Sequence, residues 1–196
     1  MQESEMRQQP IVTVFGSSQP REDDPAYREA YEVGKRLAEA GYVLCNGGTG
    51  GTMRAAAQGA RAAGGRTIGI SMDIYVPDVP NTWLDEEVRV SDLFERLQRL
   101  ILPASGFICL RGGCGTLAEW TLTWTLLASG LIPTVPLILL GAEWRPLLET
   151  VRTGMINRER DWAFLRPVET VDEAIAALRT EGFDQSVPAP SHRPLG

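Results

Sequence analysis

The chain has 196 residues, of which 43% are hydrophobic, and its formal net charge at pH 7 is -6. This length and composition are sufficient for one substantial core, and they favour one domain over two. The acidic balance provides no basic field to attract a nucleic-acid backbone or an anionic membrane surface. We therefore expect neither nucleic acid nor membrane as a partner.

Scarce residue types argue against several kinds of chemistry. The only histidine, His192, lies in a tail with Pro and Gly, which argues against a histidine-dependent nucleophile and a histidine-rich metal site. The only lysine, Lys35, lies on the solvated side of an expected surface helix, so a lysine decarboxylase with a pyridoxal Schiff base is disfavoured. Cys45, Cys109 and Cys114 are odd in number and lack C-x-x-C spacing, which is typical of reduced thiols.

The chain contains no apolar run near the roughly 20 residues that span a bilayer. Its first ten residues, "MQESEMRQQP", also lack the apolar core of a signal peptide. We expect a cytoplasmic protein.

Short apolar runs alternate with helical patterns along the chain. A β-branched run that ends in small residues predicts the first strand, and Asp24 with Pro25 predicts the start of a helix that Gly41 ends. Strands are expected at the start of residues 11–18, which continue into a loop, and at the start of 88–105. Further strands are expected in 42–45, 67–71, 106–110 and 134–141 and near 167–168. Helices are expected in residues 26–40, between 52 and 64, before Pro103, and in 115–130, 144–156 and 171–179.

This alternation implies right-handed crossovers and a mostly parallel sheet with helices on both faces, which is an α/β fold of the Rossmann-like type. We expect residues 10–182 to form one nucleotide- or phosphate-binding domain. Residues 1–9 and 183–196 are expected to be flexible ends.

Three loops at expected carboxyl ends of strands are built from small residues: 16–20, 46–52 and 111–116. Glycine permits a close approach of ligand to backbone, and a following helix offers unpaired N–H groups to an anion. One such turn is often only a tight connection, but three at one sheet edge predict a phosphate cradle. The dinucleotide fingerprint and the Walker pattern are both absent.

Glu119 follows Thr116 by three residues, at the start of the helix expected after the last of these loops. In one interpretation Glu119 is a capping carboxylate and Thr116 the cap; in the other it is held beside the phosphate cradle. Arg96 and Arg99 lie three apart and can share a helix face, although solvation at the surface is the ordinary role of such residues.

Trp120 and Trp124 lie four residues apart, with Leu127 near the same stripe. This spacing favours packing in the core or in a dimer over ligand stacking. We interpret Cys114 as a small filler residue.

The segment "RGGCGTLAEW" resembles the P-G-G-x-G-T-x-x-E motif of the LOG (Lonely Guy) family, the cytokinin riboside 5'-monophosphate phosphoribohydrolases long mislabelled as lysine decarboxylases. "NGGTGGTMRAAAQGA" resembles that family's earlier glycine loop and helix, "FGSS" its first-strand loop, and "FERLQRL" its M-x-x-R-K segment. The resemblance runs in the same order through residues 11–178.

This resemblance implies hydrolysis of the N-glycosidic bond of a cytokinin-like nucleoside 5'-monophosphate, with Arg96 and Glu119 as catalytic residues. It requires no cofactor and no metal, and it implies a homodimer, for which the helix of Trp120 and Trp124 is the expected interface. The expected phosphate- and nucleotide-binding residues are Gly16, Ser17, Ser18, Gly47, Gly48, Thr49, Gly51, Thr52, Arg111, Gly112, Gly113, Gly115 and Thr116.

Three positions depart from the family pattern. Arg111 replaces the proline of the motif, Leu97 replaces the lysine after the catalytic arginine, and Arg54 replaces a small residue. Similar glycine loops occur in molybdenum-cofactor carrier proteins. The alternative function is therefore a carrier or binding protein for a phosphorylated ligand, such as molybdenum cofactor or a nucleotide, without turnover.

Overall fold

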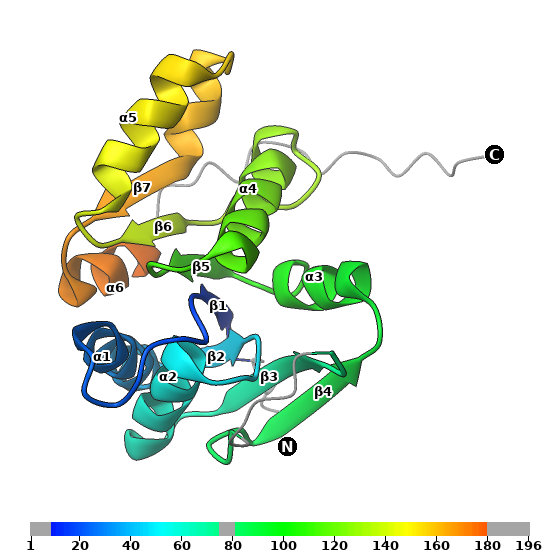
Figure 1. Cartoon of the computed structure of the whole chain (residues 1–196), viewed down its shortest axis with the longest axis vertical. Coiled ribbons are helices and arrows are strands. Elements are labelled where there is room, and N and C mark those ends of the chain that lie inside the picture. The colour runs from blue at the N-terminus through cyan, green and yellow to red at the C-terminus, as the bar shows by residue number, and fades with distance from the viewer. Residues whose placement is uncertain (1–8, 75–80, 180–196) are drawn as a thin grey trace, which may run out of the picture.

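The computed structural model describes residues 9–74 and 81–179, in which seven strands form one parallel sheet (Figure 1). The order across the sheet is β4-β3-β2-β1-β5-β6-β7, and every neighbouring pair is parallel. The strands are β1 (Ile11–Phe15), β2 (Val43–Asn46), β3 (Thr67–Met72), β4 (Glu86–Val90), β5 (Gly106–Cys109), β6 (Leu137–Leu140) and β7 (Leu165–Val168). This architecture confirms the predicted α/β, Rossmann-like class.

Helices cover both faces of the sheet. They are α1 (Pro25–Glu39), α2 (Gly51–Ala62), α3 (Leu93–Ile101), α4 (Cys114–Ala128), α5 (Trp144–Gly154) and α6 (Val171–Arg179), with the 3-10 helix η1 (Glu159–Phe164) before β7. The core beneath α1, α2 and α6 contains Val12, Leu44 and Ile138, whereas the core beneath α3, α4 and α5 contains Phe15, Phe107 and Leu139. Alternate residues of each strand thus face opposite layers, as expected for a buried parallel sheet.

The strand order reverses between β1 and β5. The chain moves from β1 outward through β2, β3 and β4, then returns to place β5 on the other side of β1. In open parallel sheets this switch point leaves a crevice outside the carboxyl ends of the strands, where ligands bind. The loops that follow β1, β2 and β5 meet there.

The tryptophans of α4 lie inside the chain. Trp120 and Trp124 stack at 5.9 Å between ring centroids, and Trp120 meets Trp144 edge-on at 5.1 Å. Both α4 tryptophans and Leu127 are buried, which confirms core packing. Their side chains are therefore not available to the dimer contact for which this helix was considered.

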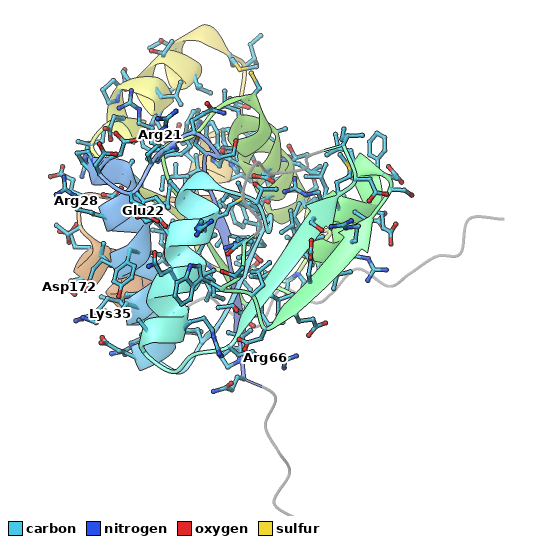
Figure 2. All side chains as sticks on the ribbon, turned by 60° about the horizontal axis from the view of Figure 1, so that its bottom comes forward. Arg21, Glu22, Arg28, Lys35, Arg66 and Asp172 are labelled. Atoms are coloured by element: carbon cyan, nitrogen blue, oxygen red, sulfur yellow. The ribbon has the colours of Figure 1, made fainter. Side chains whose placement is uncertain are left out.

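The structure also bears on the predictions for the lysine, the cysteines and membrane-spanning helices. Lys35 lies on the outer side of α1, with Nζ 3.9 Å from Glu39 (Figure 2). Cys45 and Cys109 are buried, Cys114 is exposed, and all three are free thiols. No helix in the described ranges has the length and apolar character needed to span a bilayer. His192 and the expected flexible ends fall largely outside the described residues.

Candidate functional site

Arg96 and Glu119 form a buried ion pair at the switch point. Arg96 is the fourth residue of α3 and Glu119 the sixth residue of α4, and Arg96 Nη1 lies 3.5 Å from Glu119 Oε1. Arg96 Nε donates to the carbonyl of Ile70 at 2.8 Å, and Nη2 donates to the carbonyl of Gly47 at 3.1 Å. The carboxyl ends of β2 and β3 thus fix the guanidinium, which in turn faces the carboxylate.

The surroundings of Glu119 change its acidity. Burial raises the pKa of this carboxyl group to about 7, and the positive charge of Arg96 opposes that rise. A carboxyl group with a pKa near neutrality exchanges protons readily at physiological pH, which suits general acid–base chemistry.

The structure excludes a capping role for Glu119. The N-cap of α4 is Gly113, without a side-chain cap bond, and the first turn of the helix contains no acidic residue. Thr116 is the third residue of the helix, and its hydroxyl donates to the carbonyl of Gly16 at 2.9 Å. The interpretation that paired Thr116 as cap with Glu119 is therefore wrong, because the helix begins earlier than that pairing requires.

The glycine loop after β2 is held in place by its own side chains. Asn46 donates from Nδ2 to the carbonyl of Met53 at 2.9 Å and accepts the N–H of Gly48 at 2.8 Å. Gly48 and Gly51 have φ angles of 74° and 61°, in the left-handed region that favours glycine. A Cβ atom at Gly51 would collide with the backbone of Ser17 and Ser18. These contacts join the β2 loop to the β1 loop.

The glycine loop after β5 is more open. A Cβ at Gly113 or Gly115 would meet no atom within 4 Å, whereas one at Gly112 would collide with the Thr116 side chain. Two of the three glycines thus border free space at the start of α4.

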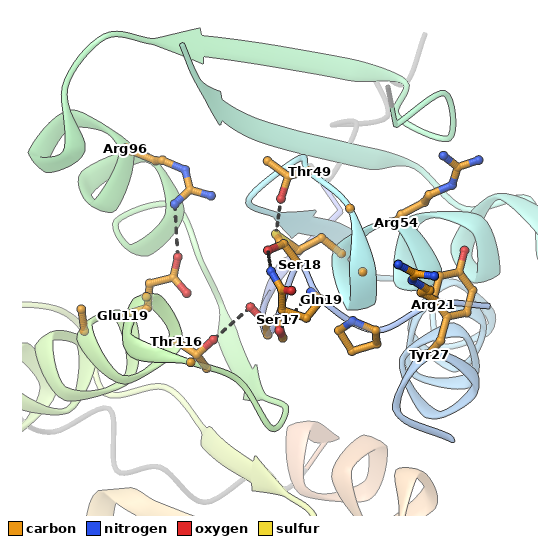
Figure 3. A pocket seen from close by; sticks show the side chains of 18 of the residues that line it. Ser17, Ser18, Gln19, Arg21, Tyr27, Thr49, Arg54, Arg96, Thr116 and Glu119 are labelled. Atoms are coloured by element: carbon orange, nitrogen blue, oxygen red, sulfur yellow. Dashed lines mark hydrogen bonds and ion pairs between the residues drawn. The ribbon is translucent and has the colours of Figure 1, made fainter. Parts of the chain in front are cut away.

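One cavity of about 980 Å³ joins these features. Figure 3 shows the Arg96–Glu119 pair at one end, with Ser17, Ser18 and Thr49 toward the middle. Of the residues expected from the sequence, the wall contains Gly16, Ser17, Ser18, Thr49, Gly51, Arg96, Gly113, Gly115, Thr116 and Glu119. These residues come from four separate segments that only the fold brings together.

The remaining expected residues lie behind or beside the wall. Gly47 supports Arg96 through its carbonyl, and Thr52 donates its backbone N–H to the carbonyl of Ser17 at 2.8 Å. Gly48 and Gly112 shape their turns. Arg111 is 74% exposed at its side chain, pairs with Glu143 at 3.6 Å, and does not line this wall.

Two groups of residues at the site were not predicted as site residues from the sequence. Asn46 is fully buried and ties the β2 loop to α2; a polar residue at the end of an apolar strand is the signal that marks it. Arg21, Glu22 and Tyr27 line the cavity from the segment before and within α1. Their loop contains no glycine motif, so its sequence carried no such signal.

Curated relatives include phosphoribohydrolases. The cytokinin riboside 5'-monophosphate phosphoribohydrolase of Mycobacterium tuberculosis is 37% identical over 98 residues, which cover 49% of this chain and 52% of that protein. The enzyme of the same name from Rhodococcoides fascians is 27% identical over 184 residues, covering 86% of this chain and 89% of the relative. The chain thus matches about half the length of the first relative and most of the second.

Solved structures of the same fold have other roles. The molybdenum cofactor carrier protein of Chlamydomonas reinhardtii superposes with a TM-score of 0.65 at 26% identity, covering 87% of this chain and 96% of that one. DNA processing protein A of Helicobacter pylori, described with a single-stranded DNA binding mode, has a TM-score of 0.59 at 15% identity, covering 87% and 80%. An identity of 15% supports a shared fold and nothing more. The expectation that this chain has no nucleic-acid partner therefore stays a prediction.

A family model gives the assignment that the motifs indicated. The model of the SLOG cluster4 family matches residues 9–131, which contain β1 through α4 and every wall residue of the cavity. The match covers more than half of the chain, and the relatives that bear the LOG activity in their names agree with the resemblance seen in the glycine motifs. The chain belongs to the SLOG cluster4 family.

Proposed function

We propose that this protein hydrolyses the N-glycosidic bond of a nucleoside 5'-monophosphate with a cytokinin-like base, and releases the free base and ribose 5-phosphate. One observation carries the proposal: the buried Arg96–Glu119 pair opens into the same cavity as the glycine loops after β1, β2 and β5. The names of the phosphoribohydrolase relatives support the same activity.

In the proposed complex the 5'-phosphate lies against the loops, with Ser17, Thr49 and the open backbone of Gly113 and Gly115 around it. Hydroxyl and backbone N–H donors suit phosphate oxygens, and the start of α4 adds the positive end of its dipole. The ribose then lies toward Glu119. Each contact in this arrangement uses a group that already borders the cavity.

The proposed reaction passes through an oxocarbenium-like state. The bond between ribose C1' and the base nitrogen breaks, and its electron pair leaves with the base. The oxygen of a water molecule bonds to C1', while the Glu119 carboxylate accepts a proton from that water and stabilises the positive charge. A second proton transfer, from Glu119 to the departing base, restores the carboxylate.

Arg96 has a different part in this proposal. Its Nε and Nη2 are engaged by the carbonyls of Ile70 and Gly47, and Nη1 faces Glu119. The guanidinium therefore orients the carboxylate and counteracts the effect of burial on its pKa. Arg96 also borders the cavity, and in this proposal it assists the leaving base.

The test is release of free base from a panel of nucleoside 5'-monophosphates that includes AMP and its N6-isopentenyl form. Glu119→Gln keeps the shape of the side chain but removes its ability to accept a proton. We expect this variant to lower the rate of nucleobase release by about 10²–10⁴-fold. Glu149→Gln is the matched control, because Glu149 is an exposed residue of α5 outside the cavity wall. A Glu119→Gln protein with the wild-type rate would remove Glu119 from the reaction.

The second candidate function is a carrier for a phosphorylated ligand. The similarity to the molybdenum cofactor carrier of Chlamydomonas reinhardtii favours it, together with the replacement of the family's motif proline and lysine by Arg111 and Leu97. A carrier would bind its ligand in the same cavity without turnover. Tight binding of a nucleotide by a protein that releases no base from any member of the panel would support this candidate.

We also propose that the protein is a cytoplasmic homodimer. Its three free thiols are suited to a reducing compartment. Leu117 of α4 and Leu131 just beyond that helix are exposed apolar side chains available to a second copy. Light scattering of the purified protein tests the dimer, and cell fractionation tests the location.

A further inference from the structure

The cavity continues beyond the residues that a nucleoside monophosphate would use. At the end away from Glu119 its wall is formed by Arg21, Tyr27 and Arg54, which we call the arginine end (Figure 3). The volume of about 980 Å³ is near the top of the range of roughly 300–1,000 Å³ found for small-molecule sites. The cavity therefore has room for a ligand longer than a monophosphate.

The arginine end is a connected group of side chains on two helices. Tyr27 is a buried residue in the first turn of α1, and its hydroxyl donates to Gln58 Oε1 of α2 at 3.0 Å. Arg54, in the first turn of α2, hydrogen-bonds to the Tyr27 side chain. Burial and the charge of Glu22 raise the pKa of Tyr27, and Arg54 opposes that rise, so the phenol stays a neutral hydrogen-bonding group beside the guanidinium.

Arg21 is brought to the same end by the turn before α1. The carboxylate of Asp24 accepts the backbone N–H of Arg21 at 2.7 Å, and the Asp24 N–H donates back to the Arg21 carbonyl at 2.9 Å. These two bonds close the turn, and the Arg21 side chain lines the cavity (Figure 3). Within the described ranges, no carboxylate forms an ion pair with Arg21.

The charges of the arginine end favour an anion. Two guanidinium groups line the wall, and Glu22 contributes one carboxylate to it, so the local balance is positive in a chain whose net charge is -6. Arginine is the side chain best suited to hold phosphate oxygens in a two-pronged contact. The Tyr27 hydroxyl already donates to Gln58, so the two guanidinium groups supply the donors for an anion at this end.

We propose that the arginine end is a second anion subsite, through which the same cavity also accepts a nucleoside 5'-diphosphate and binds it more tightly than the monophosphate. The orientation rests on the proposed function: with the ribose at Glu119 and the first phosphate at the glycine loops, the second phosphate reaches Arg21 and Arg54. Arg54 replaces a small residue of the LOG pattern, so this subsite distinguishes the chain from the relatives that its motifs resemble.

The subsite is tested by calorimetric titration of the Glu119→Gln protein with ADP and with AMP, because the slow rate expected of that variant limits hydrolysis during the measurement. We expect ADP to bind at least tenfold more tightly than AMP. Arg54→Met and Arg21→Met should each bring the ADP affinity to within about threefold of the AMP affinity, and leave the AMP affinity within twofold of the background protein.

Arg61→Met is the matched control. Arg61 lies on the same helix as Arg54, two turns later, and pairs with Asp85 outside the cavity wall, so its loss should change neither affinity. Because Arg21 is exposed on a loop, Arg21→Met keeps the test decisive if Arg54→Met lowers the melting temperature.

Equal affinities for AMP and ADP would overturn the proposal, and so would an Arg54→Met variant that weakens both ligands equally. Failure of ADP to bind would do the same. These outcomes are separate from the fate of the proposed function, because base release is measured on the wild-type protein with monophosphates. A protein that cleaves AMP but does not prefer ADP keeps its proposed activity and loses the second subsite.

Discussion

The two long glycine loops of this chain have similar compositions and different surroundings. In the loop after β2, Gly47 packs against Arg96, Gly48 and Gly51 have positive φ angles, and Asn46 bonds to both sides of the turn. In the loop after β5, Gly113 and Gly115 border free space. The first loop is built to hold its neighbours in position, and the second leaves its backbone open to a ligand.

This difference explains why counting glycines is a poor guide to ligand contact. A glycine is needed in the β2 loop because the backbone conformation or a neighbouring atom leaves no room for a side chain. In the β5 loop the same residue type leaves space for something outside the protein. A glycine-to-alanine substitution should therefore lower stability in the β2 loop and weaken ligand binding in the β5 loop.

Gly51→Ala should produce the largest effect. Its φ angle of 61° is unfavourable for alanine, and the added Cβ would collide with the backbone of Ser17 and Ser18. We expect a loss of about 2–4 kcal/mol in the free energy of unfolding, from backbone strain and overpacking together. Urea denaturation followed by circular dichroism measures it. A stability within 0.5 kcal/mol of wild type, roughly the range of a neutral surface change, would contradict the scaffold role of this loop.

Asn46→Ala should have the next largest effect on stability. The buried amide makes two hydrogen bonds, to Met53 and to Gly48, and its removal leaves their backbone groups without these partners. We expect a loss of about 1–3 kcal/mol in the same denaturation experiment. Asn81→Ala is a suitable comparison, because Asn81 makes a longer bond of 3.3 Å to the carbonyl of Thr49 from a partly buried site. Equal losses from the two variants would remove the special role of Asn46.

Most of the fold could be predicted from the sequence because distinct residues mark where helices begin and end. Asp24 and Pro25 mark the start of α1 and Gly41 follows its end, so the expected and observed helix agree to about a residue. The 3-10 helix Glu159–Phe164 was missed because six residues are too few to display a helical period. The seven-strand order was not accessible at all, since it depends on which crossover turns back at β5.

The candidate site was accessible only in part. The catalytic assignment of Arg96 and Glu119 came from the resemblance to a family motif. Spacing alone left Arg96 with the ordinary role of a surface residue, and it left Glu119 open between a helix cap and a carboxylate beside the phosphate cradle. Arg21 and Tyr27 were not found, because their place in the wall requires the β1 loop to fold over the start of α2, where Ser17 accepts the N–H of Thr52. Contacts between segments that are far apart in the chain produce no local pattern in the sequence from which these two residues could have been predicted.

The pH dependence of hydrolysis tests the role of Glu119, which lies in the helix that follows the β5 loop. Its pKa is raised to about 7, so Glu119 loses its charge as the pH falls through 7, and kcat/KM should drop about tenfold between pH 8 and pH 6. Folding has the opposite dependence: a raised pKa favours the protonated folded protein, so stability should decline as the pH rises from about 5 to 8. Glu119→Gln should lack that decline. A rate that stays constant down to pH 5 would exclude Glu119 as the base.

Gly115→Ala should produce the smallest effect on the fold and isolate the role of the β5 loop. The new methyl group meets no protein atom within 4 Å and lies inside helix α4, where alanine is favoured over glycine by roughly 0.5–1 kcal/mol. Stability should therefore stay equal or rise slightly. Because Gly115 lines the cavity, the methyl group should instead occupy space that the phosphate needs, and we expect AMP to bind about fivefold more weakly, or about 1 kcal/mol.

Gly130→Ala provides the contrast: it also adds a methyl group in open space, but outside the cavity wall and at a φ of 65°, so it should lower stability and leave binding intact. If Gly115→Ala bound AMP as well as wild type, the open backbone of this loop would not be where the phosphate lies, and the two glycine loops would differ only in how tightly they pack.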